Sequence, residues 1–215
     1  MSRPAFLSAR CIALALLLAS SLSACQLPGN TPMNAEKTVE LKVRPRPQQA
    51  YRIVMTIENA PGPFGMVEGS AQYDVVNYHE CGKINRVAGV ASRITTNPPI
   101  HWEKTSDTEY VATVYADLMV DEDYYGRGVC RWAFTQARAR LKATGADAET
   151  RFVPGINSDD ITKGNAVTLY FPDIRYPVSG IPDFVEFGDQ NPSNFKPEIQ
   201  DHLFRIVLEA HEMQP

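Results

Sequence analysis

The sequence predicts an all-β protein, an antiparallel β-sandwich with one disulfide bond and little helix. Eight or nine short segments alternate apolar with polar residues, as strands with one buried face do. Clusters of proline and glycine separate these segments at regular intervals and are typical of turns. Two cysteines and a tryptophan fall where we expect the core, an arrangement similar to immunoglobulin-like domains. This likeness is one of architecture and implies no function.

Residues 117–141 contain the strand around which we expect the core to form. An acidic, glycine-containing connection at 121–128 separates two apolar runs, and this pattern predicts a turn between strands. After it, Cys130, Trp132 and Phe134 occupy alternate positions, so they share one face of a strand. We expect that face to be the centre of the core, with the cysteine able to bond across it.

Residues 1–24 have the features of a lipoprotein signal peptide. Arg3 and Arg10 supply its positive end, residues 12–19 are apolar, and small residues lead directly into Cys25. The alternatives are an ordinary signal peptide or a transmembrane helix, but the apolar run is too short for a bilayer core of about 30 Å. We therefore expect cleavage before Cys25 and its acylation, for example with palmitate, as a membrane anchor.

The residue after the lipidated cysteine and the charge of the mature chain indicate its surroundings. Gln26 follows Cys25, and similarity to bacterial lipoproteins then implies the outer membrane, with the domain on the periplasmic face. Cleavage removes two of the 21 basic residues, which leaves 19 against 25 acidic residues and a net charge of −6. Such a domain is not suited to nucleic acid or to an anionic membrane surface, whereas a basic partner fits it better.

The cysteines predict a disulfide bond between Cys81 and Cys130. Cys11 leaves with the signal peptide and Cys25 is acylated, so these two remain for an oxidising compartment. The alternative is a pair of free buried thiols. The bond would close a loop of 48 residues, 82–129, and stabilise the fold by about 4 kcal/mol. We expect it to pin the two sheets together.

The remaining chain divides into a tether and one domain. Residues 25–50 contain several prolines and few apolar residues, so we expect a tether that is extended or disordered. Alternation over 38–43 indicates an edge strand near its end. Residues 51–215, about 165 in number, are enough for a single domain with a full core.

Alternation predicts the strands of this domain in order, each bounded by turn residues. The predicted strands cover residues 51–58, 64–76, 109–120, 132–143, 148–153, 165–171 and 203–210. The second is expected to bulge at Gly69, and residues 84–94 have apolar residues at intervals, like a further buried element. The polar residues 154–164 and the proline-rich residues 172–197 predict loops.

Two segments allow a helix as well as a strand. Residues 132–143 are rich in helix formers, and Gly145 would suit a helix C-cap. The strand requires a bulge near Thr135-Gln136, because the later apolar residues are out of phase with the earlier ones. We favour the strand, with 109–120 as its partner, because the surrounding pattern is β. Residues 198–210 fit a helix, and their last part, 203–210, fits a strand equally well.

Two loops contain side chains suited to a protein partner, namely the acidic turn and residues 172–197. Aromatic residues and arginine are favoured in interface cores, and both loops contain them. The alternatives are a solvated turn for the first loop and packing of the aromatics onto the sandwich for the second. The candidate partner-binding residues are Asp121, Glu122, Asp123, Tyr124, Tyr125, Arg127, Tyr176, Phe184 and Phe187.

We expect no catalytic, metal or cofactor site, and therefore no enzyme. The four histidines include no i, i+4 pair, and no serine lies in a G-x-S-x-G elbow. Gly126-Arg127-Gly128 is not followed by the residues of a phosphate-binding loop. The acidic residues 121–123 could attract Ca²⁺ but lack the spacing of an EF-hand.

One set of residues resembles a known group of proteins. Residues 121–132 read DEDYYGRGVCRW after Asp117-Leu118, and Ala60-Pro61-Gly62-Pro63 and Phe204-Arg205-Ile206 accompany them. From about Tyr51 to its end, the chain thereby resembles proteobacterial periplasmic lipoproteins. Some of these resemble immunity proteins, which are encoded beside antibacterial effectors of type IV or type VI secretion systems. The resemblance implies a protein that binds and neutralises a toxin in the periplasm, and it assigns no residue of the binding surface.

The alternative function is that of an envelope-maintenance or glycan-binding lipoprotein. Its basis is the same location together with exposed aromatic side chains, which can stack on sugars. It predicts an envelope phenotype on deletion in pure culture. We favour the immunity hypothesis, because a chain without catalytic groups suits a stoichiometric inhibitor.

Overall fold

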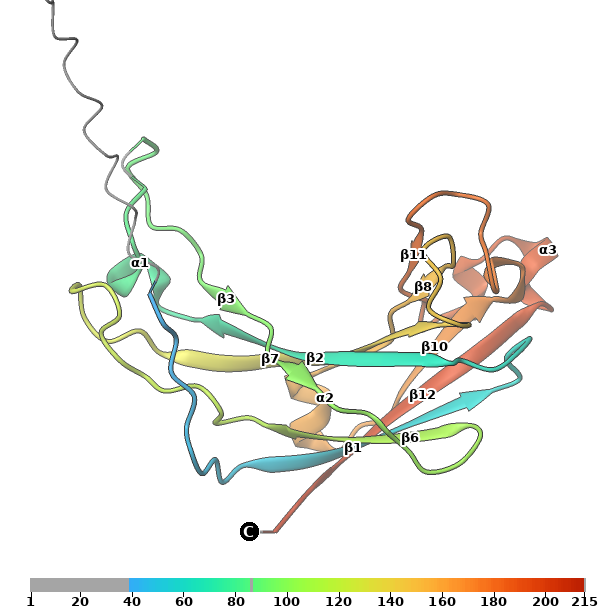
Figure 1. Cartoon of the computed structure of the whole chain (residues 1–215), viewed down its shortest axis with the longest axis horizontal. Coiled ribbons are helices and arrows are strands. Elements are labelled where there is room, and N and C mark those ends of the chain that lie inside the picture. The colour runs from blue at the N-terminus through green and yellow to red at the C-terminus, as the bar shows by residue number, and fades with distance from the viewer. Residues whose placement is uncertain (1–38, 86, 215) are drawn as a thin grey trace, which may run out of the picture. The chain divides into compact units, whose positions relative to one another are not determined.

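Two β-sheets share one core and form the layers of a sandwich in the computed structural model (Figure 1). The structure describes residues 39–85 and 87–214, so the expected signal peptide (1–24) and Cys25 lie outside it. The first sheet has the order β10 (Val167–Pro172), β12 (Leu203–Glu212), β1 (Ala50–Glu58), β6 (Glu109–Tyr115) and β5 (Glu103–Lys104). The second has the order β11 (Val185–Glu186), β8 (Arg151–Phe152), β7 (Trp132–Lys142), β2 (Met66–Val75) and β3 (Thr95–Thr96), while β4 (Pro99–Ile100) pairs with β2 and β9 (Gly155–Asn157) with β7.

Short helices make up the rest of the regular structure. They are α1 (Tyr78–Cys81), α2 (Ser158–Lys163), α3 (Pro197–Gln200) and the 3₁₀ turns η1 (Asp173–Arg175) and η2 (Pro192–Asn194). No helix of residues 39–85 and 87–214 is long and apolar enough to cross a membrane. The prediction of an all-β sandwich with little helix is confirmed, and the immunoglobulin-like comparison stays a prediction.

The first sheet follows the alternation of its sequence. In β1, Ile53, Met55 and Ile57 are buried, and their neighbours in the strand are not. β1 pairs antiparallel with β12 on one side and with β6 on the other. β12 occupies most of the segment that stayed open between helix and strand, and only α3 before it is helical.

The bulge expected in the central strand is present at Thr135. The pairing of β7 with β2 joins Gln136 to Gln72 and Phe134 to Tyr73, so Thr135 has no partner residue. The extra residue restores the phase, and Ala137, like Phe134, is buried. The strand interpretation of residues 132–143 is thereby confirmed over the helix.

Two predictions about strand pairing are wrong. The segment 109–120 is not the partner of the central strand, because β6 pairs with β1 and β5, and β2 pairs with β7. β2 is also not bulged at Gly69, because its register with β7 runs unbroken from Met66 to Gln72. Gly69 instead makes room for an indole ring, since a Cβ there would lie 2.3 Å from Nε1 of Trp102.

Three segments differ from their predicted conformation. Residues 84–85 and 87–93 form no buried element but a largely exposed hairpin with a bridge between Ile84 and Ala91. Residues 154–164 are not a plain loop but contain β9 and α2, and Gly164 ends α2 with a φ of 66°. Residues 39–43 make a single bridge, between Val43 and Met119, instead of an edge strand.

The domain also begins earlier than residue 51. The compact unit starts at Val39, and the backbone of Lys42 and Arg44 bonds to residues 118 and 120. Both Gln48 and Gln49 donate their backbone N–H to the carboxylate of Asp117, at 3.0–3.1 Å. The last part of the expected tether is therefore hydrogen-bonded to the domain.

Candidate protein-binding surface

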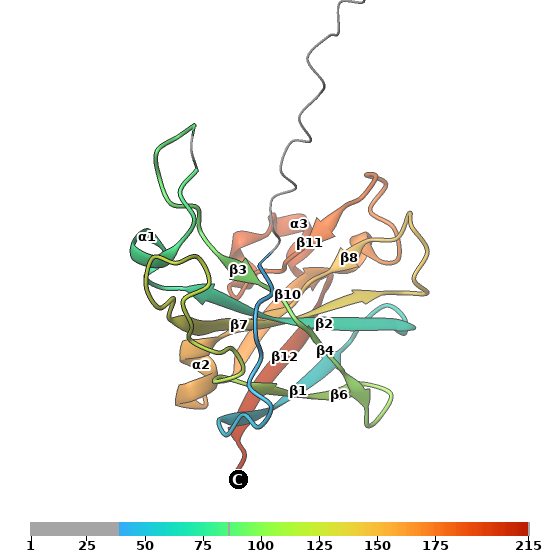
Figure 2. The same cartoon turned by 60° about the vertical axis from the view of Figure 1, so that its left-hand side comes forward.

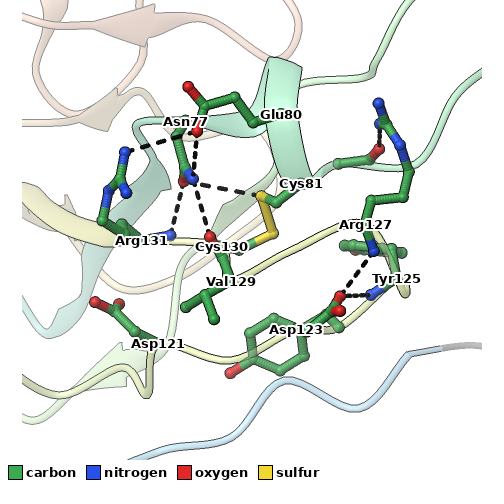
Figure 3. The surroundings of a disulfide bond; sticks show 12 residues. Asn77, Glu80, Cys81, Asp121, Asp123, Tyr125, Arg127, Val129, Cys130 and Arg131 are labelled. Atoms are coloured by element: carbon green, nitrogen blue, oxygen red, sulfur yellow. Dashed lines mark hydrogen bonds and ion pairs between the residues drawn. A yellow bond between two sulfur atoms is a disulfide. The ribbon is translucent and has the colours of Figure 1, made fainter.

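A disulfide bond joins Cys81, in α1, to Cys130, two residues before the start of β7 (Figure 3). The Cα atoms are 5.3 Å apart, and both sulfurs are buried. The predicted bond is therefore present, but it does not pin the two sheets together. Because β2 and β7 are antiparallel neighbours, the end of β2 lies beside the start of β7, and the bond links two connections of one sheet.

Asn77 connects the elements around this bond. Its Nδ2 donates to the carbonyl of Val129 at 2.9 Å and to the carboxylate of Glu80 at 3.2 Å. Its Oδ1 accepts the backbone N–H of Arg131 at 2.8 Å. Figure 3 shows these bonds converging on the amide beside the disulfide. One buried amide thus holds α1, the loop before β7 and the first residue after Cys130 in one arrangement.

Replacing Asn77 with alanine should lower the free energy of unfolding by about 1–3 kcal/mol, because the part-buried hydrogen bonds to the Val129 carbonyl and the Arg131 N–H are lost. Chemical denaturation monitored by tryptophan fluorescence measures this. Asn85, which is exposed, supplies the matched asparagine-to-alanine control, and its substitution should cost less. Equal losses from the two substitutions would contradict the structural role of Asn77.

The acidic residues of the turn are used to build the turn itself. Oδ1 of Asp121 accepts the backbone N–H of Trp132 at 2.8 Å. Glu122 forms an ion pair with Lys42 at 2.6 Å. Asp123 accepts backbone N–H groups of Tyr125 and Arg127, at 3.3 and 3.0 Å. These carboxylates therefore close the loop, and the side chains of Asp121 and Asp123 do so while exposed.

The charges in the turn are stabilised locally. Burial acts to raise the pKa of Asp123, but backbone N–H groups of residues 125–128 outweigh it and hold that pKa below its ordinary value. The hydrogen bond to Glu122 raises the pKa of Lys42. Both groups therefore stay charged at neutral pH, and the turn keeps its ion pair and its hydrogen bonds.

The tyrosines of the turn cover a small second core. Tyr124 and Tyr125 are half-buried against a cluster of Val75, Cys81 and Cys130. The Tyr124 hydroxyl donates to the carbonyl of Val120 at 2.6 Å, and burial raises the pKa of Tyr125. We call the end of the second sheet that contains Cys81 and Cys130 the disulfide end. The two rings mainly support this end, and they are partly exposed at its surface.

The candidates in residues 172–197 lie in a different region. Tyr176 packs edge-on to Phe64 and donates its hydroxyl to the carbonyl of Pro63, so it belongs to the main core. Phe184 is half-buried beneath the guanidinium of Arg175, 4.6 Å from the ring centre. Only Phe187 is exposed, at 57%. β11, which precedes Phe187, pairs with β8, and β8 pairs with Leu141 near the end of β7 that is far from Cys130. The nine candidates therefore do not form one site.

The sequence prediction missed the most exposed element of the disulfide end, a hairpin formed by residues 83–85 and 87–93. Figures 1 and 2 both show it extending beyond α1, away from the sheets. Asn85 shapes its turn, because Oδ1 accepts the N–H groups of Val87 and Ala88 at 2.9 and 3.0 Å. The N–H of Gly89 donates to the Asn85 carbonyl at 2.8 Å, with Gly89 at a φ of 68°.

The base of the hairpin is fixed to the acidic turn and the disulfide. The guanidinium of Arg127 donates to the carbonyl of Gly82, directly after Cys81. Gly82 is required there, because a Cβ would lie 2.5 Å from the carbonyl oxygen of Tyr78. The candidate Arg127 therefore supports the hairpin, and the covalent bond and this hydrogen bond limit how far its base can move.

The disulfide end concentrates exposed apolar side chains. Val87 is 99% exposed and Val90 is 59% exposed, although the backbone around both is hydrogen-bonded. The exposed large apolar side chains of this end are Val76, Ile84, Val87, Val90 and Val129. A fully exposed valine on an ordered turn loses little conformational entropy when a partner covers it, so this end suits protein binding.

Comparisons with known proteins give no further guide. No protein-family model, no curated protein and no solved structure matches this chain. Within the described part of the chain, no three histidine, cysteine, aspartate or glutamate side chains are grouped so that they could hold a metal ion.

Proposed function

We propose that this chain is a non-enzymatic immunity protein, a lipoprotein at the periplasmic face of the outer membrane that binds and blocks a secreted antibacterial effector. The binding surface is the disulfide end, with the hairpin of residues 83–85 and 87–93 at its centre. The location and the class of partner rest on the predicted signal peptide and on the resemblance described above. The observation that supports the mechanism is a hairpin with the exposed Val87 and Val90, which begins two residues after the disulfide-bonded Cys81.

The physical argument concerns the entropy of binding. A stoichiometric inhibitor must lose little freedom when it binds, and a covalently fixed hairpin has less freedom to lose than an open loop. The valine side chains at 87 and 90 provide apolar area for a cleft in the partner, while Oδ1 of Asn85 accepts the backbone N–H groups of Val87 and Ala88. The acidic mature chain speeds the encounter with a basic effector.

The test is co-expression with the product of an adjacent effector gene in the periplasm of a sensitive host. The wild-type chain should protect the host and co-purify with the effector. The variant V87D/V90D should weaken binding by at least about tenfold and lose protection, because charges replace the apolar contacts at the centre of the interface.

The matched control is I174D/I181D, which adds the same two charges to exposed positions of the other region. Both variants should keep the wild-type melting temperature, since all four side chains are exposed. Equal killing of the host with and without the wild-type chain, together with no complex, would eliminate the proposal. Equal protection by the two variants would move the binding surface away from the hairpin.

The glycan-binding alternative has less support. It needs exposed aromatic rings, and of the five aromatic candidates Phe187 alone is exposed. An empty peptidoglycan pull-down and a silent deletion in pure culture would remove it, whereas direct binding to peptidoglycan would favour it over the immunity proposal.

A further inference from the structure

A basic groove lies on the outer face of the second sheet, at the end of β7 opposite the disulfide. It has a volume of about 300 Å³ and is lined by side chains of β2, β7 and β8 and by residues around β11. After the bulge in β7, Ala137, Ala139 and Leu141 point into the core, so Arg138 and Arg140 point outward. Arg151 of β8 joins them.

The groove has more positive than negative charge. Arg140 forms an ion pair with Glu68 across β2 and β7, at 3.3 Å. Among the ion pairs of residues 39–85 and 87–214, none includes Arg138 or Arg151. Two arginines in a net acidic protein therefore face one groove without a carboxylate partner.

Arg138 is held in place by neutral groups. Its Nε donates to Oε1 of Gln136 at 2.8 Å, and Nε2 of Gln136 donates to Oε1 of Gln72 at 2.8 Å. Gln72 donates in turn to the carboxylate of Asp74 at 2.9 Å. The stem of Arg138 lies over Gly155, where a Cβ would come within 3.1 Å of its Cγ. This series of hydrogen bonds fixes the guanidinium of Arg138 through Nε. Its two Nη atoms remain for a ligand.

Arg151 is fixed in the same way, by one bond to a neutral acceptor. Its Nη2 donates to the carbonyl of Asp183 at 2.9 Å. Apolar side chains lie beside the arginines in the groove, namely Val153, Val185 and the exposed Phe187. Guanidinium groups fixed beside apolar surface suit a ligand in which carboxylates alternate with apolar side chains.

We propose that this groove binds an acidic peptide segment of another protein, whose carboxylates pair with Arg138 and Arg151 and whose apolar side chain covers Phe187. Planar guanidinium groups bind carboxylates through two parallel hydrogen bonds, and Arg138 uses Nε, not its two Nη atoms, for its bond to Gln136. A concave groove of this size admits a few side chains, whereas a membrane surface needs a broad basic face. The site is independent of the effector surface proposed above, which lies at the other end of β7.

The test uses a fluorescein-labelled octapeptide of alternating glutamate and leucine, titrated with the purified full-length chain and followed by fluorescence anisotropy at low ionic strength. The peptide should bind saturably, and the same peptide with glutamine in place of glutamate should bind at least about tenfold more weakly. R138Q/R151Q should weaken binding of the glutamate peptide by about tenfold or more.

The control variant R46Q/R52Q removes two exposed arginines outside the groove and should bind like wild type. Melting curves verify that both variants fold. Equal binding by the two variants, equal binding of the two peptides, or no binding would overturn the proposal. Vesicles of phosphatidylglycerol form a further arm, and binding of vesicles but not of the peptide, lost in R138Q/R151Q, would overturn it in favour of a lipid headgroup.

Discussion

Replacing Phe152 with alanine should lower the free energy of unfolding by about 3–5 kcal/mol, the usual cost of truncating a buried aromatic side chain. Phe152 is fully buried and is the second of the two residues of β8, which lies between β11 and β7. Its ring contacts the rings of Phe64, Phe171 and Phe204 at centroid distances of 5.6, 5.8 and 5.4 Å. Phe171 and Phe204 belong to the first sheet, and Phe64 lies in the connection between β1 and β2. The vacated volume would lie between these rings, which cannot all move inward.

Urea unfolding monitored by tryptophan fluorescence and by circular dichroism gives this value. I174A is a suitable control, since Ile174 is 72% exposed and its truncation should change stability by less than about 0.5 kcal/mol. A loss below about 1 kcal/mol for F152A would mean that the aromatic cluster is not the centre of the core.

Removal of the disulfide should also lower the free energy of unfolding, but through the entropy of the unfolded chain instead of the packing of the core. The double variant C81S/C130S avoids a leftover free thiol and should unfold with about 4 kcal/mol less free energy, because the unfolded chain regains the freedom of a closed loop of 48 residues. Amide hydrogen exchange should also become faster in residues 83–85 and 87–93, since the base of the hairpin loses its covalent support.

Reduction provides the control for this variant. Wild-type chain in a strong thiol reductant should unfold like C81S/C130S, and the reductant should not change the variant. The same urea midpoint for wild type with and without reductant would contradict the prediction. Loss of stability without faster exchange in the hairpin would separate the bond's global effect from its proposed role in the binding surface.

Strand positions were predictable, and strand partners were not. Burial of one face leaves a period of two in the sequence, and this alternation by itself was enough to place β1. β7 also required a bulge and the β pattern around it, and the segment of β12 was equally open to a helix. The same period says nothing about which strand lies beside which. The pairing of β6 with β1 depends on contacts distant in sequence, and for that reason its predicted pairing with the central strand was wrong.

The candidate site was predictable only in its general location. The charged and aromatic residues of the turn were selected for recognition chemistry, but several of them use that chemistry inside the loop, as Asp123 and Arg127 do. The hairpin was missed because apolar residues recur at intervals in this segment, as they do in a buried element. Asn85 followed four residues later by Gly89 was the available signal, since this pair favours a turn.

The bulge at Thr135 determines which residues of β7 face the core. Before it, the even-numbered Phe134 faces the core, and after it the odd-numbered positions do, so that Ala137 is buried and Arg138 faces solvent. Loss or gain of one residue between Phe134 and Ala137 would bury the arginines of the groove and expose the core alanines. The number of residues at this one position is therefore as constrained as any side chain in the core.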